Sequence, residues 1–284
     1  MRKTIPVILV LAAVLAAGCS HGYRVQKRSN VVGYLYPDES APSKPNPGAA
    51  YLQLPLRIGI AFVPANPSTR GPATLQSLFP PDAEKRLLDL VTKSFEGRDW
   101  VGHIQVIPTS YLVPGGGFEN LQQVTRLMNV DVVALVSVDQ LQTSDPRRIS
   151  FLYLSIVGAY VLPLDKNETR TLIDAAVFHV PSRTFLLRAP GVSSLTGSST
   201  AVDVPQVLRE RSLKGFEVAM QDLTKNLDRE VTDFKTSIAE GRRQDVDVYT
   251  AKGESVRSGG AFGAAEAAVA LALAGFLAVR RRRR

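Results

Sequence analysis

The sequence is poor in the residue types that most often carry chemistry. It holds one cysteine, Cys19, so no disulfide can form within the chain. Its three histidines, His21, His103 and His179, have no second histidine or cysteine at a metal-binding spacing, so we expect no metal and no cofactor. A Gly-x-Ser-x-Gly motif is also missing. These absences favour a protein that is not an enzyme, with an unmarked catalytic site as the open alternative.

Two further motifs are too incomplete to indicate catalysis. Gly115-Gly116-Gly117 precedes a predicted helix and could bind an anion through free amide groups, but the lysine and Ser/Thr of a P-loop do not follow. A flexible surface loop is the better interpretation. Asp131 and Asp139 lie at the two ends of one predicted strand and have no carboxylate partner at an informative spacing.

Positive charge is concentrated at the two ends of the chain. Of 34 basic and 26 acidic residues, seven basic ones and one acidic one lie in the terminal segments, which leaves 27 against 25 between them. The excess of positive charge therefore belongs to targeting rather than to a binding surface, and no nucleic-acid partner is expected.

The C-terminal segment has the pattern of a membrane anchor with a weak outer end. Residues 261–279 are an apolar run long enough to cross a bilayer as a helix, and Arg280 to Arg284 mark its cytoplasmic side. Glu266 lies inside the run and makes insertion less favourable. Gly259 and Gly260 precede the run and oppose helix formation. The segment is therefore either a simple permanent anchor or a signal for proteolytic processing.

The N-terminal segment has the pattern of a bacterial export signal. Arg2 and Lys3 precede an apolar stretch, and small residues lead directly to Cys19. This arrangement resembles the lipobox of bacterial lipoproteins, with Ala16 in the place usually held by leucine. The resemblance implies that residues 1–18 are removed and that Cys19 becomes an acylated N-terminus, which would anchor the chain to membrane lipids.

Both ends together resemble the rhombotarget lipoprotein family. Ser258-Gly259-Gly260, the apolar run and the terminal arginines are similar to the GlyGly-CTERM sorting signal, which rhombosortase, an intramembrane serine protease, cleaves. The resemblance implies that Ser258, Gly259 and Gly260 form the processing site. It further implies that the lipoprotein-processing and lipoprotein-sorting machinery act on the chain. The precursor would lie in the inner membrane, and the product in the outer membrane or at the cell surface.

We expect five parts in the chain: a signal peptide (1–18), a proline-rich tether (19–50), a globular domain (51–240), a polar linker (241–257) and the sorting signal (258–284). Within the tether, residues 31–36 are apolar enough to pack on the domain or add an edge strand. The linker is expected to be an exposed spacer, in which Arg242 and Arg243 could contact anionic lipid heads.

Hydrophobic periodicity predicts the elements of the domain. A helix starts at Pro80-Pro81-Asp82 and ends at Gly97, a second covers 118–128, and a long third is capped by Asp203 and stopped by Gly241. An apolar stripe on this third helix docks it on the sheet, with a coiled-coil partner as the alternative. The predicted strands cover 54–63, 104–111, 130–138, 150–162, 171–180 and 183–188, with 192–199 continuing the last strand or looping off.

This order predicts an α/β fold in which a mixed sheet is sandwiched with helices. The layout, with residues 58–64, 106–112 and 131–136, is weakly similar to the curli-secretion lipoprotein and the TolB amino-terminal domain. That resemblance implies partner binding or assembly rather than catalysis. We therefore expect a non-enzymatic exported lipoprotein that is lipidated at Cys19 and cleaved near Gly259. The alternative is a permanently membrane-anchored envelope scaffold or partner-binding lipoprotein.

Overall fold

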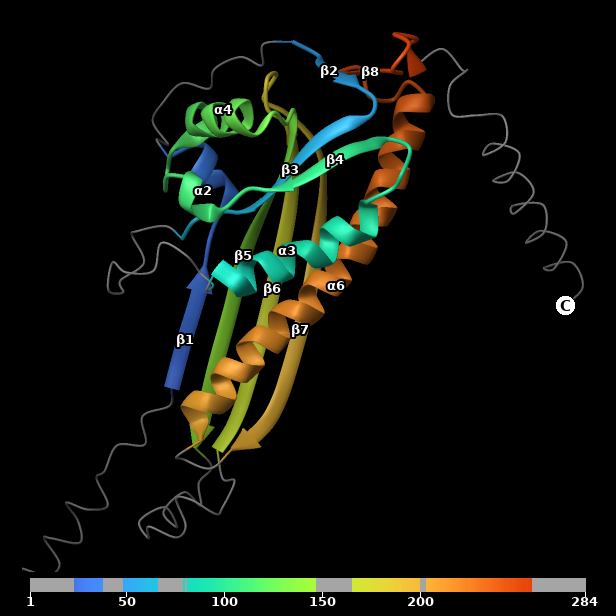
Figure 1. The fold of residues 1–284 in the computed structure, drawn as a ribbon. Coiled ribbons are helices and arrows are strands. Elements are labelled where there is room, and N and C mark those ends of the chain that lie inside the picture. The colour runs from blue at the N-terminus through green and yellow to red at the C-terminus, as the bar shows by residue number, and fades with distance from the viewer. Residues whose placement is uncertain are drawn as a thin grey trace, which may run out of the picture. The chain divides into compact units, whose positions relative to one another are not determined.

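The chain has a mixed α/β fold with a sheet flanked by helices, as predicted (Figure 1). The computed structural model describes residues 23–37, 48–65, 79, 81–146, 165–199 and 203–256. The signal peptide, Cys19, the strand expected at 150–162 and the sorting signal all lie outside these residues. Among the described residues, no helix combines the length and the apolar character that a membrane crossing requires.

The described residues form two compact units. The larger unit holds 27–140, 171–193 and 213–256, and the smaller holds 23–26, 141–146, 165–170, 194–199 and 203–212. Five elements have residues in both units, namely β1 (Tyr23–Arg28), β5 (Val132–Pro146), β6 (Asp165–His179), β7 (Thr184–Ser199) and α6 (Val204–Ala239). The remaining elements belong to the larger unit: α2 (Val31–Leu35), β2 (Ala50–Gln53), β3 (Leu56–Phe62), α3 (Pro81–Phe95), β4 (Val101–Val106), the 3-10 helix η1 (Thr109–Tyr111), α4 (Gly117–Met128) and β8 (Val246–Tyr249).

The main sheet of the described residues is part parallel and part antiparallel. Its strand order is β4-β3-β5-β6-β7, and β1 also pairs with β5. Strand β3 runs parallel to both neighbours, with Ile58 opposite Ile104 on one side and Val132 on the other. Strands β6 and β7 are joined by the short turn at 180–183, which requires an antiparallel pair. A second, two-stranded sheet pairs β2 with β8 in parallel.

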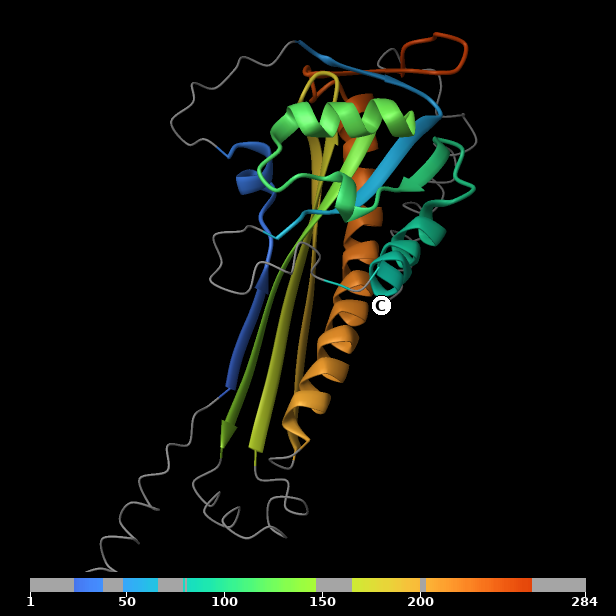
Figure 2. The same cartoon turned by 60° about the vertical axis from the view of Figure 1, so that its left-hand side comes forward.

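Each face of the sheet in the larger unit is covered by different helices (Figure 2). Alternate residues of a strand point to opposite faces, so neighbouring apolar residues of β3 and β5 enter different cores. Phe62 and Val136 pack with α3 and α6, whereas Ala61 and Leu135 pack with α2 and α4. A third cluster lies around β2 and β8 and includes Leu52, Ile238 and Val248.

The three predicted helices are confirmed. Helix α3 begins at Pro81 and ends before Gly97, which has a φ of +76°. Helix α4 ends at Asn129, whose left-handed conformation closes the last turn. The apolar stripe of α6 faces the sheet, where Phe216, Met220 and Leu223 are fully buried.

Strand β5 continues to Pro146, well beyond the end predicted at Val138. The buried positions in its later part are polar, namely Gln140, Gln142 and Ser144. A prediction based on apolar residues therefore ends the strand too early. In the smaller unit, Gln142 Nε2 donates to the backbone oxygen of Leu208 at 2.7 Å and to Thr169 Oγ1 at 3.2 Å. Asn167 Nδ2 donates to Ser199 Oγ at 2.7 Å. The interior of this unit is therefore held in part by hydrogen bonds of buried polar side chains, to one another and to the backbone.

Part of the expected tether belongs to the fold. Residues 23–28 form β1, and residues 31–35 form helix α2 rather than an edge strand, capped by the Asn30 side chain, which accepts from the amide of Val32. Lys27 lies beside the rings of Phe79 and Phe216, with its Nζ 5.9 and 5.8 Å from their centroids. Burial lowers the pKa of Lys27. Residues 27–35 of the segment expected to act as a spacer are thus packed against the domain.

Candidate functional site

The site residues predicted from the sequence, Cys19, Ser258, Gly259 and Gly260, lie outside the described residues. The structure does describe the segment that leads to the glycine pair. After β8 the chain turns at Gly253, which has a φ of +80°, and the amide of Thr250 donates to the Glu254 oxygen at 2.9 Å. Tyr249 and Ser255 then pair as an antiparallel bridge. The chain is therefore held in a hairpin immediately before the expected processing site.

The last described residue, Val256, is buried, with an exposed fraction of 3%. It belongs to the cluster that includes Leu52, Ile238 and Val248. The expectation that residues 241–257 form an exposed spacer is therefore wrong for residues 246–249 and 256, whereas residues 251–255 are exposed as expected. Two residues, Arg257 and Ser258, separate Val256 from Gly259, and the three steps from one to the other span no more than about 11 Å even when fully extended. The glycine pair is thus tied closely to the folded unit.

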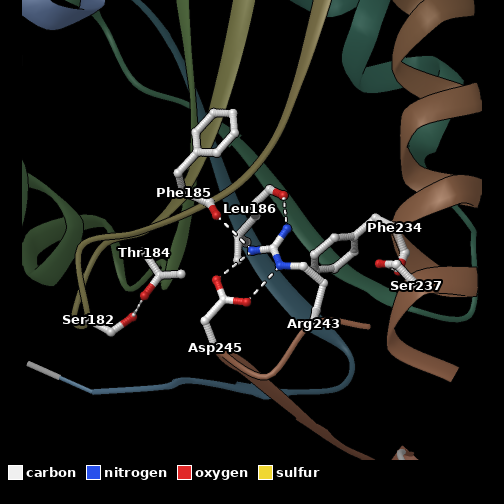
Figure 3. A network of polar contacts seen from close by, with 8 residues as sticks. All are labelled: Ser182, Thr184, Phe185, Leu186, Phe234, Ser237, Arg243 and Asp245. Atoms are coloured by element: carbon white, nitrogen blue, oxygen red, sulfur yellow. Dashed lines mark hydrogen bonds and ion pairs between the residues drawn. The ribbon is translucent and has the colours of Figure 1, made fainter. Parts of the chain in front are cut away.

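Arg243 anchors the start of this C-terminal segment (Figure 3). Its guanidinium donates to both carboxylate oxygens of Asp245, at 2.7 and 2.8 Å. Two further bonds reach the backbone oxygens of Leu186 and Phe185, at 2.8 and 2.9 Å. The ring of Phe234 lies 5.4 Å from the guanidinium carbon. Arg243 thus joins α6 and β7 to the residue that precedes β8. Because its guanidinium is engaged within the fold, these contacts argue against the lipid contact expected for it. Among the bonds described, the Arg242 side chain pairs only with the exposed Glu240.

The same network protects an edge of the main sheet. Strand β7 ends the strand order, so its outer backbone groups have no partner among the strands that the structure describes. Side chains satisfy several of them. Arg243 binds the Phe185 and Leu186 oxygens, Asn226 Nδ2 donates to the Pro190 oxygen at 2.7 Å, and the Val192 amide donates to Asp222 Oδ2 at 3.1 Å. Such cover hinders pairing with another chain at this edge.

A histidine and a serine lie together at the β6–β7 turn. His179 Nδ1 is 2.6 Å from Ser182 Oγ, which is 2.8 Å from Thr184 Oγ1, and all three side chains are buried. Burial lowers the pKa of His179, and the nearby Asp131 opposes this in part. A hydrolase would need an accessible serine and a carboxylate on the histidine. Ser182 is enclosed, and Asp131 holds Arg57 through both oxygens, so this network stabilises the turn.

The triglycine segment has a structural role at the start of α4. Gly115 and Gly117 have φ values of +69° and +65°, which side chains strongly disfavour. The Asn120 side chain lies against Gly116 between them, and its Oδ1 accepts from the Val113 amide at 2.9 Å and from Tyr34 Oη at 3.0 Å. The loop is thus fixed between α2 and α4.

An apolar cavity lies in the larger unit between the sheet, α3 and α6. Its volume is about 120 Å³. The lining is apolar almost throughout: it comprises Leu52, Leu54, Leu56, Ile58, Ile60, Val91, Thr92, Phe95, Trp100, Ile104, Val132, Ala134, Val177, Leu186, Leu187, Leu227, Val231, Phe234, Lys235, Ile238 and Val248. Protein interiors contain few voids of this size.

The cavity is closed at one end and partly exposed at the other. Ile60, Val91 and Leu227 are buried at the inner end, whereas Trp100 and Lys235 are half-exposed. The Lys235 ammonium lies 5.1 Å from the centre of the Trp100 ring. No sequence pattern predicts this cavity, because its apolar lining residues have the character of ordinary core residues.

In the described part of the chain, no group of three His, Cys, Asp or Glu side chains is placed to hold a metal ion. No protein-family model and no curated protein sequence matches the chain. Among solved structures, it is similar to a neuraminyllactose-binding hemagglutinin homologue of Helicobacter pylori, at 12% identity and a TM-score of 0.37, over 72% of this chain and 96% of that one. It is also similar to the dodecameric PelC protein of Paraburkholderia phytofirmans in a variant form, at 11% identity and a TM-score of 0.23, over 70% and 99%. Neither likeness is close enough to bear on function.

Proposed function

We propose that this protein is a non-enzymatic exported lipoprotein whose C-terminal anchor is removed by an intramembrane serine protease of the rhombosortase type. Cys19 carries the acyl chains, and Ser258, Gly259 and Gly260 form the cleavage region. The observation that carries the proposal is the junction at Val256. The folded unit ends in a buried residue, and the glycine pair and apolar run follow directly.

The two anchors explain why cleavage is needed. An acylated N-terminus can be extracted from the inner membrane by a carrier, but a helix across the bilayer cannot follow that route. Removing residues beyond the glycine pair leaves Cys19 as the single anchor and permits transfer to the outer membrane or cell surface. The protease supplies the nucleophile, and this chain supplies an extended, deformable peptide.

The test replaces both Gly259 and Gly260 by leucine in the full chain, produced in a host that has the protease. We expect a full-length species that retains Arg280 to Arg284 and fractionates with the inner membrane, measured by intact mass and membrane fractionation. A matched control replaces Ala267 and Ala268 by leucine, which adds the same bulk but keeps the glycine pair, and should be processed normally. Normal shortening of the glycine variant would overturn the proposal.

A permanently anchored envelope scaffold is the alternative. It is favoured by the short distance between Val256 and the apolar run, which would hold the folded unit beside the membrane surface. The intact mass of the native protein separates the two: loss of about the last 25 residues supports processing, and retention of the terminal arginines supports the scaffold.

A further inference from the structure

We propose that the cavity between α3, α6 and the sheet binds a short aliphatic carboxylate, with its chain inside and its carboxylate beside Lys235. The inference concerns the larger unit alone and does not depend on processing of the C-terminus. It rests on the chemistry of the lining, the volume and the charge at the open end.

The lining excludes a polar occupant. The cavity surface carries no exposed polar atom, even though Thr92 and Lys235 are among its neighbours. A water molecule needs two or more polar partners to be held in a protein interior, and apolar cavities of this kind stay dry. The occupant must therefore present only carbon and hydrogen to the inner end.

The volume sets the length of the chain. An apolar cavity of about 150 Å³ accepts benzene. At about 120 Å³, this cavity has room for roughly four or five carbons. A six-carbon carboxylate has five carbons beyond its carboxyl group and matches this volume, whereas a long acyl chain would have to extend out of the cavity.

The open end favours a negative charge. Lys235 lies on α6 with its stem along the cavity and its ammonium over the Trp100 ring. A lysine placed in this way keeps its carbons on the apolar surface and its charge at the water boundary. A carboxylate that emerges at the same boundary would meet the ammonium, whereas a neutral head group would gain no such contact.

Trp100 provides the measurement, because it is the single tryptophan of the chain. The full chain is reconstituted in phosphatidylcholine vesicles, which contribute no indole emission, and is titrated with hexanoate. We expect a saturable change in Trp100 fluorescence, and binding of hexanol at least fivefold weaker than that of hexanoate. Decanoate should bind no more tightly than hexanoate.

Variants locate the ligand. Ala134→Leu places three extra carbons in the cavity and should weaken hexanoate binding at least tenfold while its melting temperature stays at or above that of the parent. If the melting temperature of Ala134→Leu is below that of the parent, Val231→Phe is used in its place. This substitution fills the cavity from a partly exposed position of α6, and its hexanoate binding is then compared with that of the parent. Lys235→Gln should reduce hexanoate binding to the level of hexanol, whereas Lys225→Gln, on the exposed side of the same helix, should not change it.

Three results would overturn the assignment. They are a fluorescence change that does not saturate, equal binding of hexanoate and hexanol by the parent protein, and unchanged hexanoate binding in a folded cavity-filling variant. None of these results bears on cleavage at Gly259, so the two proposals fail separately.

Discussion

Gly191 in β7 lies directly against Ala219 in α6. A Cβ atom at Gly191 would stand 2.2 Å from the Ala219 carbonyl oxygen and 2.7 Å from the Leu223 amide nitrogen. Both obstacles are backbone atoms of a helix, which no side-chain rotation can move. Strand and helix can pack this closely only because position 191 has no side chain.

The first prediction concerns this contact. Gly191→Ala should lower the free energy of unfolding by about 3 kcal/mol, since the helix or the strand must shift to admit the methyl group. The measurement is urea unfolding followed by Trp100 fluorescence. Gly102→Ala is the control, because a Cβ atom at Gly102 would have its nearest contacts at 3.3 Å, to Pro55. This variant should change the free energy of unfolding by less than about 1 kcal/mol. Equal stability of both variants would contradict the prediction.

Arg243 and Arg242 form a natural pair for a second test. Arg243→Ala leaves two backbone oxygens and Asp245 without their donor, and should lower stability by about 2 kcal/mol. Arg243→Lys should recover little, because an ammonium cannot reproduce the planar fork. Arg242→Ala breaks only an exposed pair and should change stability by less than about 0.5 kcal/mol. If Arg242→Ala were as harmful as Arg243→Ala, the clamp would not be the cause.

A third prediction concerns the buried carboxylate of Glu84. Its Oε1 accepts from the Thr109 amide at 2.9 Å and from Thr109 Oγ1 at 2.7 Å, which ties the first turn of α3 to the segment after β4. Thr109→Val removes the hydroxyl donor and should lower stability by about 2 kcal/mol. Thr109→Ser keeps that donor and should cost less than half as much. The midpoints of urea unfolding of the two variants are compared, and equal midpoints would show that the Thr109 hydroxyl does not stabilise the fold through Glu84.

The fourth prediction concerns acid stability. Burial holds the pKa of His179 below its ordinary value near 6.5, so below that value the unfolded chain binds a proton that the native state resists. Stability from this group is therefore complete above about pH 6.5 and declines as the pH falls towards the folded-state pKa. His179→Asn keeps a polar atom for Ser182 but does not titrate.

The variant should accordingly lose less stability than the parent between pH 7 and pH 5. Urea midpoints at these two pH values give the comparison, and Ser182→Ala, which removes the hydroxyl beside His179 but leaves the imidazole in place, is the control that should remain more acid-sensitive than His179→Asn. If the urea midpoint of His179→Asn fell as much between pH 7 and pH 5 as that of the parent, the acid sensitivity would belong to other groups.

The sequence predicted those elements whose signals are local. Pro81 and Gly97 bound α3, and Asp203 and Gly241 bound α6, because proline, capping side chains and glycine act within one helical turn. The strand at 54–63 was correct in place, although cis-Pro55 precedes the observed start at Leu56. The predicted strand at 104–111 was wrong in its second half, where Thr109–Tyr111 form a 3-10 turn.

Elements that depend on distant partners were missed. Strand β8 is four residues of alternating character, and its pairing with β2 cannot be read from either segment alone. The later part of β5 has buried Gln142 and Ser144, so a search for apolar residues ends too early. Arg243 looked like a solvated linker residue, since its partners at Phe185 and Leu186 are almost sixty positions away.

The parallel pairing of β2 with β8 determines when the second sheet can form during folding. Ala50 is synthesised long before its pairing partner Val246, which is among the last of the described residues to be synthesised. Pairings of such long sequence separation form slowly, because closing the loop is opposed by chain entropy. A chain delivered from its N-terminus, whether from a ribosome or through a translocation channel, cannot cover Leu52 until residue 248 has emerged. The second sheet is therefore completed only after the whole of α6 has been delivered.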